Sequence, residues 1–424
     1  MALPLRSGLA PSPQPSPQWG EGDREPHDLH SLSPRGEGQG EITASINCLP
    51  LSVERLRLSA FRSYPTFELK VDERPVVLTG ENGAGKTNIL EALSLMGPGR
   101  GLRGVKIAQM GHRKVGEAAA GVPFAIACRA GSGGDVADLG TGQLDTMSER
   151  RQARIDGTDA TLGALSERVR LVWLTPAMDR LFVEGPAERR RFLDRLTLAR
   201  MPAHAPHAAA YERAMRERNR LLRDGPRDPQ WLSALEREMA HHGAAIATAR
   251  LRTVEALEGA LETQGAFPRA LLTLEGTLET LLAQGHLEDE VEARFAQMLA
   301  PARPRDEAAG RTLDGPHTSD LAVTHGETGR AAAHCSTGEQ KALLVGLILA
   351  QTRLVREESG HAGPLLLLDE IAAHLDARRR AALFDEILTL RVQAWMTGTD
   401  ASAFASLGAR AQHFAVAGGI FSPQ

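Results

Sequence analysis

Cysteine, lysine and aromatic residues are scarce in this chain of 424 residues. Its three cysteines, Cys48, Cys128 and Cys335, lie far apart, form no CxxC pair and have no histidine at zinc-finger spacing. A disulfide scaffold and a cysteine zinc site are therefore not expected, and a reducing cytoplasm is the expected location. Aromatic residues make up only 4% of the chain, too few for a long platform on which single-stranded bases could stack.

Long hydrophobic runs are also missing. The longest ones, residues 343–350 and 365–368, are far shorter than the roughly 20 residues that span a bilayer. The N-terminal residues have no continuous apolar stretch before Pro11, which argues against a secretory signal. We therefore expect no membrane association.

Neither sign of charge dominates, because 49 Lys and Arg face 53 Asp and Glu, a formal net charge of −4. This balance excludes a protein that is basic all over, but not a local basic patch. The length favours two or three domains, or one large α/β domain with an insertion. With 42% hydrophobic and 24% charged residues, the chain has globular composition, so wholesale disorder and a pure coiled coil are not expected.

The N-terminal segment differs from the rest of the chain. Residues 1–46 are rich in Pro, Gly, Ser, Glu and Gln and cannot bury enough apolar surface to offset chain entropy. We predict that residues 1–50 are a disordered extension. A functional tail is one interpretation, but a dispensable extension or a wrongly assigned start is favoured.

Period-two patterns predict an α/β fold after residue 50. VERLRLSAF (53–61) and FELKV (67–71) alternate apolar and charged residues, which predicts an antiparallel pair turning around 63–65. PVVLTG (75–80) predicts a buried strand that runs into a helix over 88–95. Strand-like runs follow between 120 and 175, with a Gly-rich turn at 131–134, and an Arg-rich helix starts near Pro186.

A long helical insertion follows. Residues 203–300 are dominated by Ala, Leu, Glu and Arg at helical spacing, with one strand-like run at 269–276. The Pro-rich residues 301–312 predict a linker, after which short strands return at 321–323. We predict an α/β ATPase head formed by residues 51–202 and 305–424, interrupted by a mainly helical arm, lobe II, at 203–304.

The strongest motif is a phosphate loop that follows a predicted strand and opens a helix. It fits GxxxxGK[ST] and consists of Gly80, Glu81, Asn82, Gly83, Ala84, Gly85, Lys86 and Thr87. Backbone N–H groups from Asn82 to Lys86 would cradle the β-phosphate of ATP, Lys86 would reach the β/γ oxygens, and Thr87 would hold Mg²⁺.

A second motif is the apolar run at 364–368 that ends in Asp369 and Glu370. It predicts a buried parallel strand that brings two carboxylates to the sheet edge. Asp369 would complete the Mg²⁺ site with Thr87, and Glu370 would act as the general base beside the catalytic Lys86. A solvated strand end is the alternative, which the phosphate loop in the same chain disfavours.

A third motif, Ser336-Thr-Gly-Glu-Gln340, opens an apolar helix. Ser336 and Glu339 form a capping-box pattern, but Gly338 and Gln340 are not needed for a cap. The motif precedes the acidic strand by about thirty residues, as an ABC-type signature does. In that arrangement Ser336 Oγ and the Gly338 N–H meet the γ-phosphate held by a second protomer, and both roles are compatible.

Further candidates lie downstream. Asp376 ends the stretch AHLD (373–376), where an ABC dimer has its D-loop, and His374 is expected to be a surface or interface residue. Thr397 and Thr399 end a strand near the position of a switch residue that faces the γ-phosphate, with Asp400 next to them.

Residues 189–223 carry ten Arg against three acids. This excess favours contact with the phosphates of duplex DNA, although arginines at helical spacing also form simple solvated faces. The DNA-binding candidates are Arg189, Arg190, Arg191, Arg216, Arg218 and Arg220.

Together these segments resemble the RecF family of ATPases in the SMC/Rad50 group. The resemblance rests on LRLSAFRSY (56–64), WLTPAMDRLFVEGPAERRRFLD (173–194), YERAMRERNRLL (211–222) and GPHTSDLAV (315–323), with the three motifs above, all in family order. It implies an ABC-type ATPase head, an ATP-dependent homodimer that clamps DNA, and slow hydrolysis that releases it. It also implies action in the cytoplasm on the nucleoid, at gapped DNA, single-strand/duplex junctions or stalled forks, with RecR and RecO to load recombinase.

Some residues depart from the family pattern. Ala60, Ala177 and Thr318 stand where the family often has Asn, an acid and Arg. The γ-phosphate sensor of the Q-loop is left open among Asp179, Gln109 and Gln143. The arm has no long heptads and no CxxC hook, which excludes a tether of SMC or Rad50 length.

The sequence supports two other function classes less well. A transporter or another ABC-type ATPase is disfavoured by the size of the insertion. A scaffold that binds ATP without hydrolysing it would not need Glu370.

Removing residues 1–46 should leave the fold and the ATPase activity intact, because this segment has no apolar periodicity with which to pack. Thermal unfolding and ATP turnover of the truncated and full-length chains test this. A truncated protein that melts several degrees lower would show that the segment is part of the fold.

Overall fold

The computed structural model describes residues 51–113, 122–144, 150–225, 228–262, 266–359, 363–373 and 375–424. The predicted disordered extension and the prediction for His374 therefore lie outside the described residues. Cys128 and Cys335 are both buried as free thiols. In the part of the chain that the structure describes, no helix combines the length and hydropathy needed to cross a membrane.

The first of two six-stranded sheets is antiparallel, in the order β2-β1-β4-β5-β6-β7. Its strands are β1 (Ser52–Phe61), β2 (Tyr64–Lys70), β4 (Phe124–Ser132), β5 (Asp135–Gln143), β6 (Gln152–Ile155) and β7 (Thr158–Ala160). Phe61 pairs with Tyr64, so the chain turns at Arg62 and Ser63. The predicted antiparallel pair is confirmed.

The second sheet is mainly parallel, in the order β14-β13-β3-β12-β11-β8. Its strands are β3 (Val76–Thr79), β8 (Arg170–Leu174), β11 (Pro364–Leu368), β12 (Ala394–Gly398), β13 (Gln412–Ala417) and β14 (Ile420–Pro423). On β11, Leu365 and Leu367 face one core, whereas Leu366 and Leu368 face another. Since both faces of a central parallel strand are covered, an unbroken apolar run is the pattern that such a strand needs.

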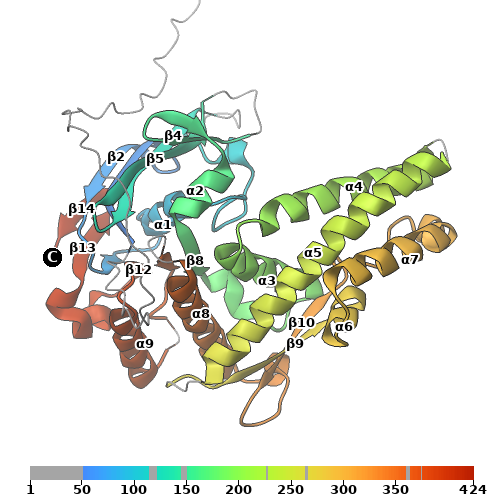
Figure 1. Ribbon diagram of the computed structural model, residues 1–424. Helices are drawn as coiled ribbons and strands as arrows, with labels where there is room; N and C mark the ends of the chain where they lie inside the picture. The colour runs from blue at the N-terminus through green and yellow to red at the C-terminus, as the bar shows by residue number, and fades with distance from the viewer. Residues whose placement is uncertain are drawn as a thin grey trace, which may run out of the picture.

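Helix α1 (Lys86–Ser94) fills the layer between the two sheets. Its Leu90 and Leu93 are fully buried in one cluster with Leu56 of β1 and Trp395 of β12. The other face of the parallel sheet is covered by α3 (Pro186–Arg200), α8 (Thr337–Ser359) and α9 (Ala377–Leu390). The head is thus layered, with α1 between the two sheets (Figure 1).

Smaller elements connect these layers. They are η1 (Ile107–Gln109), α2 (Leu162–Arg168), η2 (Pro176–Arg180), η3 (Ala332–His334) and η5 (Ala401–Arg410). They also add side chains to the two cores, among them the fully buried Phe404 of η5 and Leu165 of α2.

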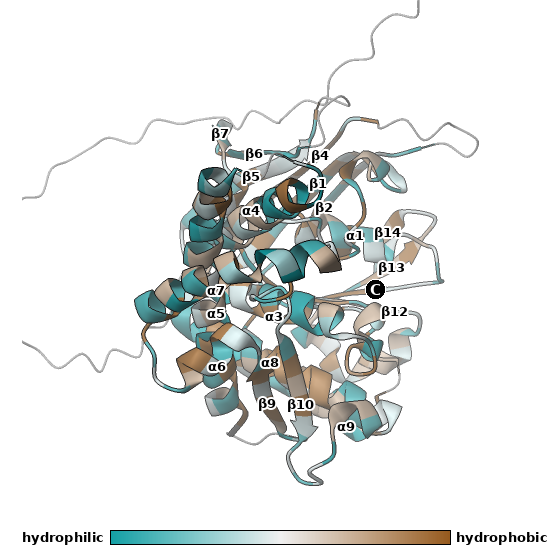
Figure 2. Ribbon diagram, turned by 90° about the vertical axis from the view of Figure 1, so that its right-hand side faces the viewer, coloured by the Kyte–Doolittle hydropathy of each residue, from teal (hydrophilic) through white to brown (hydrophobic). Residues whose placement is uncertain are grey.

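The arm is formed by α4 (His204–Asp224), α5 (Pro229–Glu262), α6 (Thr277–Ala283) and α7 (Glu288–Ala309). Figure 1 shows α4 and α5 side by side, extending away from the sheets. Tyr211, Met239 and Phe295 lie in the arm's own buried cluster. Figure 2 shows hydrophilic and hydrophobic bands along these helices, as expected for amphipathic helices packed on one side.

A small antiparallel sheet joins the arm to the head. It pairs β9 (Ala270–Glu275) with β10 (Asp320–His325), which confirms the strands predicted at 269–276 and 321–323. The predicted domain boundaries at 202/203 and 304/305 remain predictions.

The linker predicted over 301–312 is wrong, because α7 continues to Ala309 and contains Pro301 and Pro304. Proline normally breaks a helix, since it lacks an N–H donor and its ring crowds the preceding turn. Here Phe295 and Leu299 bury one side of the helix before the prolines, and Asp306 is buried after them. These tertiary contacts hold the helical path that the local sequence disfavours.

Arg218 is the buried polar centre of the arm, with none of its surface exposed. Its Nε donates to Glu236 Oε1 at 3.0 Å, and its Nη1 donates to Asp306 Oδ2 at 2.8 Å. Further bonds reach the Thr312 hydroxyl and the Leu299 carbonyl. The guanidinium thus ties α4 to α5 and α7, and the prediction that Arg218 binds DNA is wrong.

Arg218→Ala should destabilise the protein by about 3–5 kcal/mol, because the buried Asp306 loses its closest cationic partner and the buried Glu236 keeps only its bonds to Arg303. Chemical denaturation gives the free energy of unfolding. Arg216→Ala is the matched control on the same helix. Its side chain is 65% exposed and pairs with Glu212 at the surface, so a change below about 1 kcal/mol is expected. Equal losses in both variants would contradict the structural role of Arg218.

Candidate nucleotide site

The phosphate loop connects β3 to α1 as the sequence predicts, and it holds Lys86 in a buried position. The Lys86 ammonium donates to the carbonyls of Gly80 at 2.7 Å and Glu81 at 3.1 Å. The same ammonium lies 3.4 Å from Glu370 Oε1. The cation therefore sits at the start of α1, where the helix dipole and the free N–H groups also favour an anion.

Two glycines of the loop are required by their surroundings. Gly80 has φ 150°, and a Cβ there would lie 2.1 Å from the carbonyl oxygen of Val416. Gly85 has φ 107°, and a Cβ there would lie 2.4 Å from Tyr64 Oη. The loop can thus run close to β13 and to the β1–β2 turn only because these residues lack side chains.

Asp369 joins three separate segments at the C-terminal end of β11. Its Oδ1 accepts a hydrogen bond from the Thr87 hydroxyl at 2.9 Å and another from the Thr397 hydroxyl at 2.8 Å. The predicted neighbours Thr87 and Asp369 therefore meet, although 282 residues separate them. A hydroxyl and a carboxylate oxygen are hard ligands that suit Mg²⁺, so these residues fit the ion.

Glu370 adopts an unusual backbone conformation, with φ 50°. For a residue with a Cβ the left-handed region costs roughly 1–2 kcal/mol. Its N–H donates to Thr397 Oγ1 at 2.8 Å, which helps to hold this geometry. The conformation turns the carboxylate toward Lys86 and leaves the side chain 25% exposed, accessible to a water molecule.

The site is a cavity of about 460 Å³. Its lining residues are Asn82, Gly83, Gly85, Lys86, Thr87, Asn88, Leu102, Arg103, Thr175, Pro176, Ala177, Asp369 and Glu370. The volume and the mixture of a cation, acids and backbone N–H groups suit a phosphorylated ligand.

Arg103 is a lining residue that the sequence did not single out. Its Nη1 donates to Asn88 Oδ1 at 2.9 Å and to Glu91 Oε2 at 3.2 Å, and its side chain is 40% exposed. The buried Glu91 also pairs with Arg62. Arg103 adds positive charge to the cavity. Its position depends on the path of a loop, which a periodic sequence pattern does not predict.

The switch candidates occupy different environments. Thr397 is fully buried. Its hydroxyl donates to the Asp369 carboxylate and accepts from the Glu370 backbone N–H, so Thr397 positions these two residues rather than facing the cavity. Thr399 is exposed and keeps the switch role as a prediction. Asp400 caps η5, and hydrogen bonds from the side chain and the N–H of Ser402 lower its pKa.

None of the three Q-loop candidates is among the described residues that line the cavity. Lys341 Nζ donates to Asp179 Oδ2 at 3.3 Å, Gln143 is buried in β5, and Gln109 is exposed in η1. Thr175, Pro176 and Ala177, just before Asp179, line the cavity instead. The cavity lining therefore does not support any of these sensors.

The signature motif combines a helix cap with an exposed edge. The Ser336 N–H donates to Glu339 Oε2 at 2.7 Å and the Ser336 hydroxyl accepts from the Glu339 N–H at 3.3 Å, which confirms the capping box. The hydroxyl also donates to Glu339 Oε2 at 2.8 Å. Hydrogen bonds from the N–H and the hydroxyl of Ser336 lower the pKa of Glu339. Ser336 is exposed and Gly338 half-buried, and neither is among the described residues lining this chain's cavity.

Gln340 does not fit the predicted contact with a partner's nucleotide. Its side chain is buried, and its amide nitrogen donates to the Cys335 carbonyl at 2.8 Å. Gln340 therefore supports the turn that leads into α8. The sequence could not show this, since the position also lies within the signature pattern.

Asp376, the D-loop candidate, is the N-cap of α9 and accepts from the Arg379 N–H at 2.8 Å. The Arg379 guanidinium donates to the Gly338 carbonyl at 3.3 Å. The D-loop and the signature are thus neighbours on one surface, linked through one arginine.

The remaining arginine candidates divide into internal and exposed groups. Arg189 forms a two-pronged ion pair with Asp320, and Arg190 donates to the Ser319 carbonyl at 2.6 Å, so both tie α3 to the segment around β10. Arg191, Arg216 and Arg220 have side chains that are 60–68% exposed. The exposed three remain DNA-binding candidates.

Comparison with known proteins shows similarity along most of the chain. The family model described as RecF/RecN/SMC N terminal domain matches residues 52–412. The chain is 52% identical over 376 residues to the DNA replication and repair protein RecF of Rhizobium meliloti (strain 1021), covering 87% of this chain and 98% of the relative. It is 51% identical over 365 residues to the protein of the same name from Caulobacter vibrioides (strain ATCC 19089 / CIP 103742 / CB 15), covering 84% and 94%.

Two solved structures share the fold. They are described as the recombination mediator protein RecF in the RecFOR pathway, one as RecF-ATPrS and one as RecF-ATP. The first has a TM-score of 0.75 at 20% identity and covers 89% of this chain and 99% of its own. The second has a TM-score of 0.74 at 21% identity and covers 89% and 100%. The α/β ABC-type ATPase head with its helical arm is therefore the fold of this chain.

Proposed function

We propose that this chain, which belongs to the RecF family, is a DNA replication and repair protein that binds DNA under the control of ATP. The observation that carries the proposal is the convergence of Thr87, Asp369 and Glu370 around the buried Lys86 in one cavity. This arrangement supplies the cation, the Mg²⁺ ligands and the base that phosphoryl transfer to water requires.

Each residue has a defined role in this proposal. Lys86 exchanges its bonds to the loop carbonyls for phosphate oxygens, and Thr87 and Asp369 hold Mg²⁺, which neutralises charge on the phosphates when bound. Glu370 accepts a proton from the attacking water. Hydrolysis is slow in a single chain, because the described lining of the cavity includes no signature residue to stabilise the γ-phosphate.

Glu370→Gln should bind ATP normally but lower turnover by about 10²–10⁴-fold, because the amide cannot accept the proton. Lys86→Ala should lose nucleotide binding altogether. Equilibrium binding of a labelled nucleotide and single-turnover hydrolysis separate the two effects. Turnover by Glu370→Gln equal to that of the unmodified chain would refute the base assignment and favour the alternative, an ATP-locked scaffold.

We further propose that ATP drives homodimerisation. Ser336 and Gly338 lie on the same surface as Asp376, away from their own chain's cavity, and are accessible to a second protomer. Their hydroxyl and N–H would cover the partner's γ-phosphate. Two nucleotides would then be enclosed between two heads.

The proposed dimer grips DNA through its arginines. Arg191 of α3 and Arg216 and Arg220 of α4 have mostly exposed side chains. Figure 1 shows where these two helices lie. These arginines suit the phosphates of duplex, gapped or junction DNA, and two copies would double the contacts. By family likeness we propose that the chain acts in the cytoplasm, on the nucleoid, with RecR and RecO to load recombinase at gaps or stalled forks.

Ser336→Arg should spare ATP binding by the monomer but abolish ATP-dependent dimerisation, because it places a bulky side chain where the partner's phosphate docks. Sedimentation with and without ATP measures the oligomeric state. DNA affinity should also fall, with a flatter salt dependence, since each phosphate neutralised adds about 0.9 to the slope with which log K falls against the logarithm of the salt concentration.

Ser336→Ala is the matched control for this experiment. It removes the helix cap, worth about 1 kcal/mol, without adding bulk. Dimerisation should be weakened at most, and it should be lost only in Ser336→Arg. If Ser336→Arg still dimerises with ATP, Ser336 is only a helix cap.

A further inference from the structure

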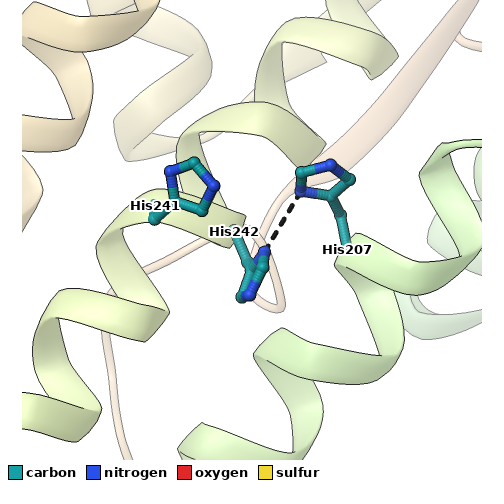
Figure 3. Close-up of side chains that lie close together, drawn as sticks. All are labelled: His207, His241 and His242. Atoms are coloured by element: carbon teal, nitrogen blue, oxygen red, sulfur yellow. Dashed lines mark hydrogen bonds between the residues drawn. The ribbon is translucent and has the colours of Figure 1, made fainter.

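Three histidines gather on the arm, away from the nucleotide cavity. His207 lies in the first turn of α4, and His241 and His242 are consecutive residues of α5. One ring nitrogen from each lies within 4.8 Å of the others. Figure 3 shows the three rings turned toward a common point between the two helices, with His207 Nδ1 and His242 Nδ1 3.1 Å apart.

This arrangement is unfavourable for three charged imidazoles, because like charges this close repel. Burial, followed by proximity to His241, lowers the pKa of His207. Burial and the two neighbouring histidines also lower the pKa of His242. A neutral imidazole keeps a lone pair that can bind a metal ion.

A carboxylate from a third helix completes the surroundings. Glu292 of α7 places its Oε2 3.0 Å from His241 Nδ1. A carboxylate bonded to a ligating imidazole fixes the orientation of the ring and raises its basicity. The exposed side chain of His241 leaves the cluster open to an ion from solvent.

We propose that His207, His241 and His242 form a binding site for one divalent transition-metal ion, with Zn²⁺ as the expected occupant. Imidazole nitrogens suit Zn²⁺, and three of them with a water make the four-coordinate set that Zn²⁺ adopts. The site is chemically distinct from the oxygen ligands Thr87 and Asp369, which suit Mg²⁺. Metal binding would clamp α4 to α5 and stiffen the arm that carries the exposed arginines Arg216 and Arg220.

Titration of the untagged full-length chain with Zn²⁺, in the presence of excess Mg²⁺ to occupy carboxylate sites, measures the affinity and stoichiometry. One equivalent should bind tightly, and the double variant His207→Ala/His242→Ala should bind at least tenfold more weakly. His286→Ala is the control, since His286 pairs with Glu290 outside the cluster. The affinity of the His286→Ala variant for Zn²⁺ should equal that of the unmodified chain.

Co²⁺ provides a second measurement that needs no variant. Bound to the unmodified chain, it should give the intense visible absorption of a four-coordinate site, and Zn²⁺ should displace it. Equal Zn²⁺ affinity in the unmodified chain and the double variant would overturn the proposal. So would a weak, octahedral Co²⁺ spectrum in the unmodified chain, which would leave the histidines as a hydrogen-bonded link between α4 and α5.

Discussion

The hydrogen bonds of the buried Asp369 carboxylate are the interaction on which the head depends. An ionised carboxylate taken out of water is costly unless it is fully bonded. Thr87 from α1 and Thr397 from β12 supply those bonds. The parallel sheet must therefore place β3, β12 and β11 side by side, which is the observed strand order. The arm is inserted between Thr87 and Asp369, so the folding of two distant segments onto one sheet creates the nucleotide site.

Much of the head follows from local sequence, but side-chain orientation does not. The phosphate-loop pattern predicts a loop between a strand and a helix, and the apolar run before Asp369 predicts a buried strand. Both structures are found as predicted. Thr397 shows the limit, since its distance from Asp369 depends on the pairing of β11 with β12. Gln340 shows the same limit. It belongs to the signature pattern, but its side chain is buried and completes a turn.

The arm was harder to predict because helical spacing does not reveal which face packs. Pro301 and Pro304 suggested a linker, yet buried side chains on both sides of them keep α7 helical. Arg218 has the same sequence context as Arg216, but lies at the centre of three helices. Part of the local excess of positive charge is therefore neutralised by ion pairs inside the protein. The proposed DNA surface would therefore contain fewer arginines than the sequence suggests. The proposed dimer, which doubles their number, would then contribute more to the affinity for DNA.

The side-chain hydrogen bond from Ser336 to Glu339 and the proposed contact with a partner's nucleotide compete for one hydroxyl proton. Ser336 has a single O–H, and it is donated to Glu339. To donate to a phosphate instead, Ser336 must release Glu339, whose pKa is lowered by the same hydrogen bonds. An ionised Glu339 beside an incoming phosphate would repel it, so the glutamate must turn away as the partner docks. The free energy lost with the side-chain hydrogen bond to Glu339 then opposes dimerisation, and the added interactions of a bound nucleotide would offset it. The same motif can thus stabilise the monomer and make association conditional on ATP.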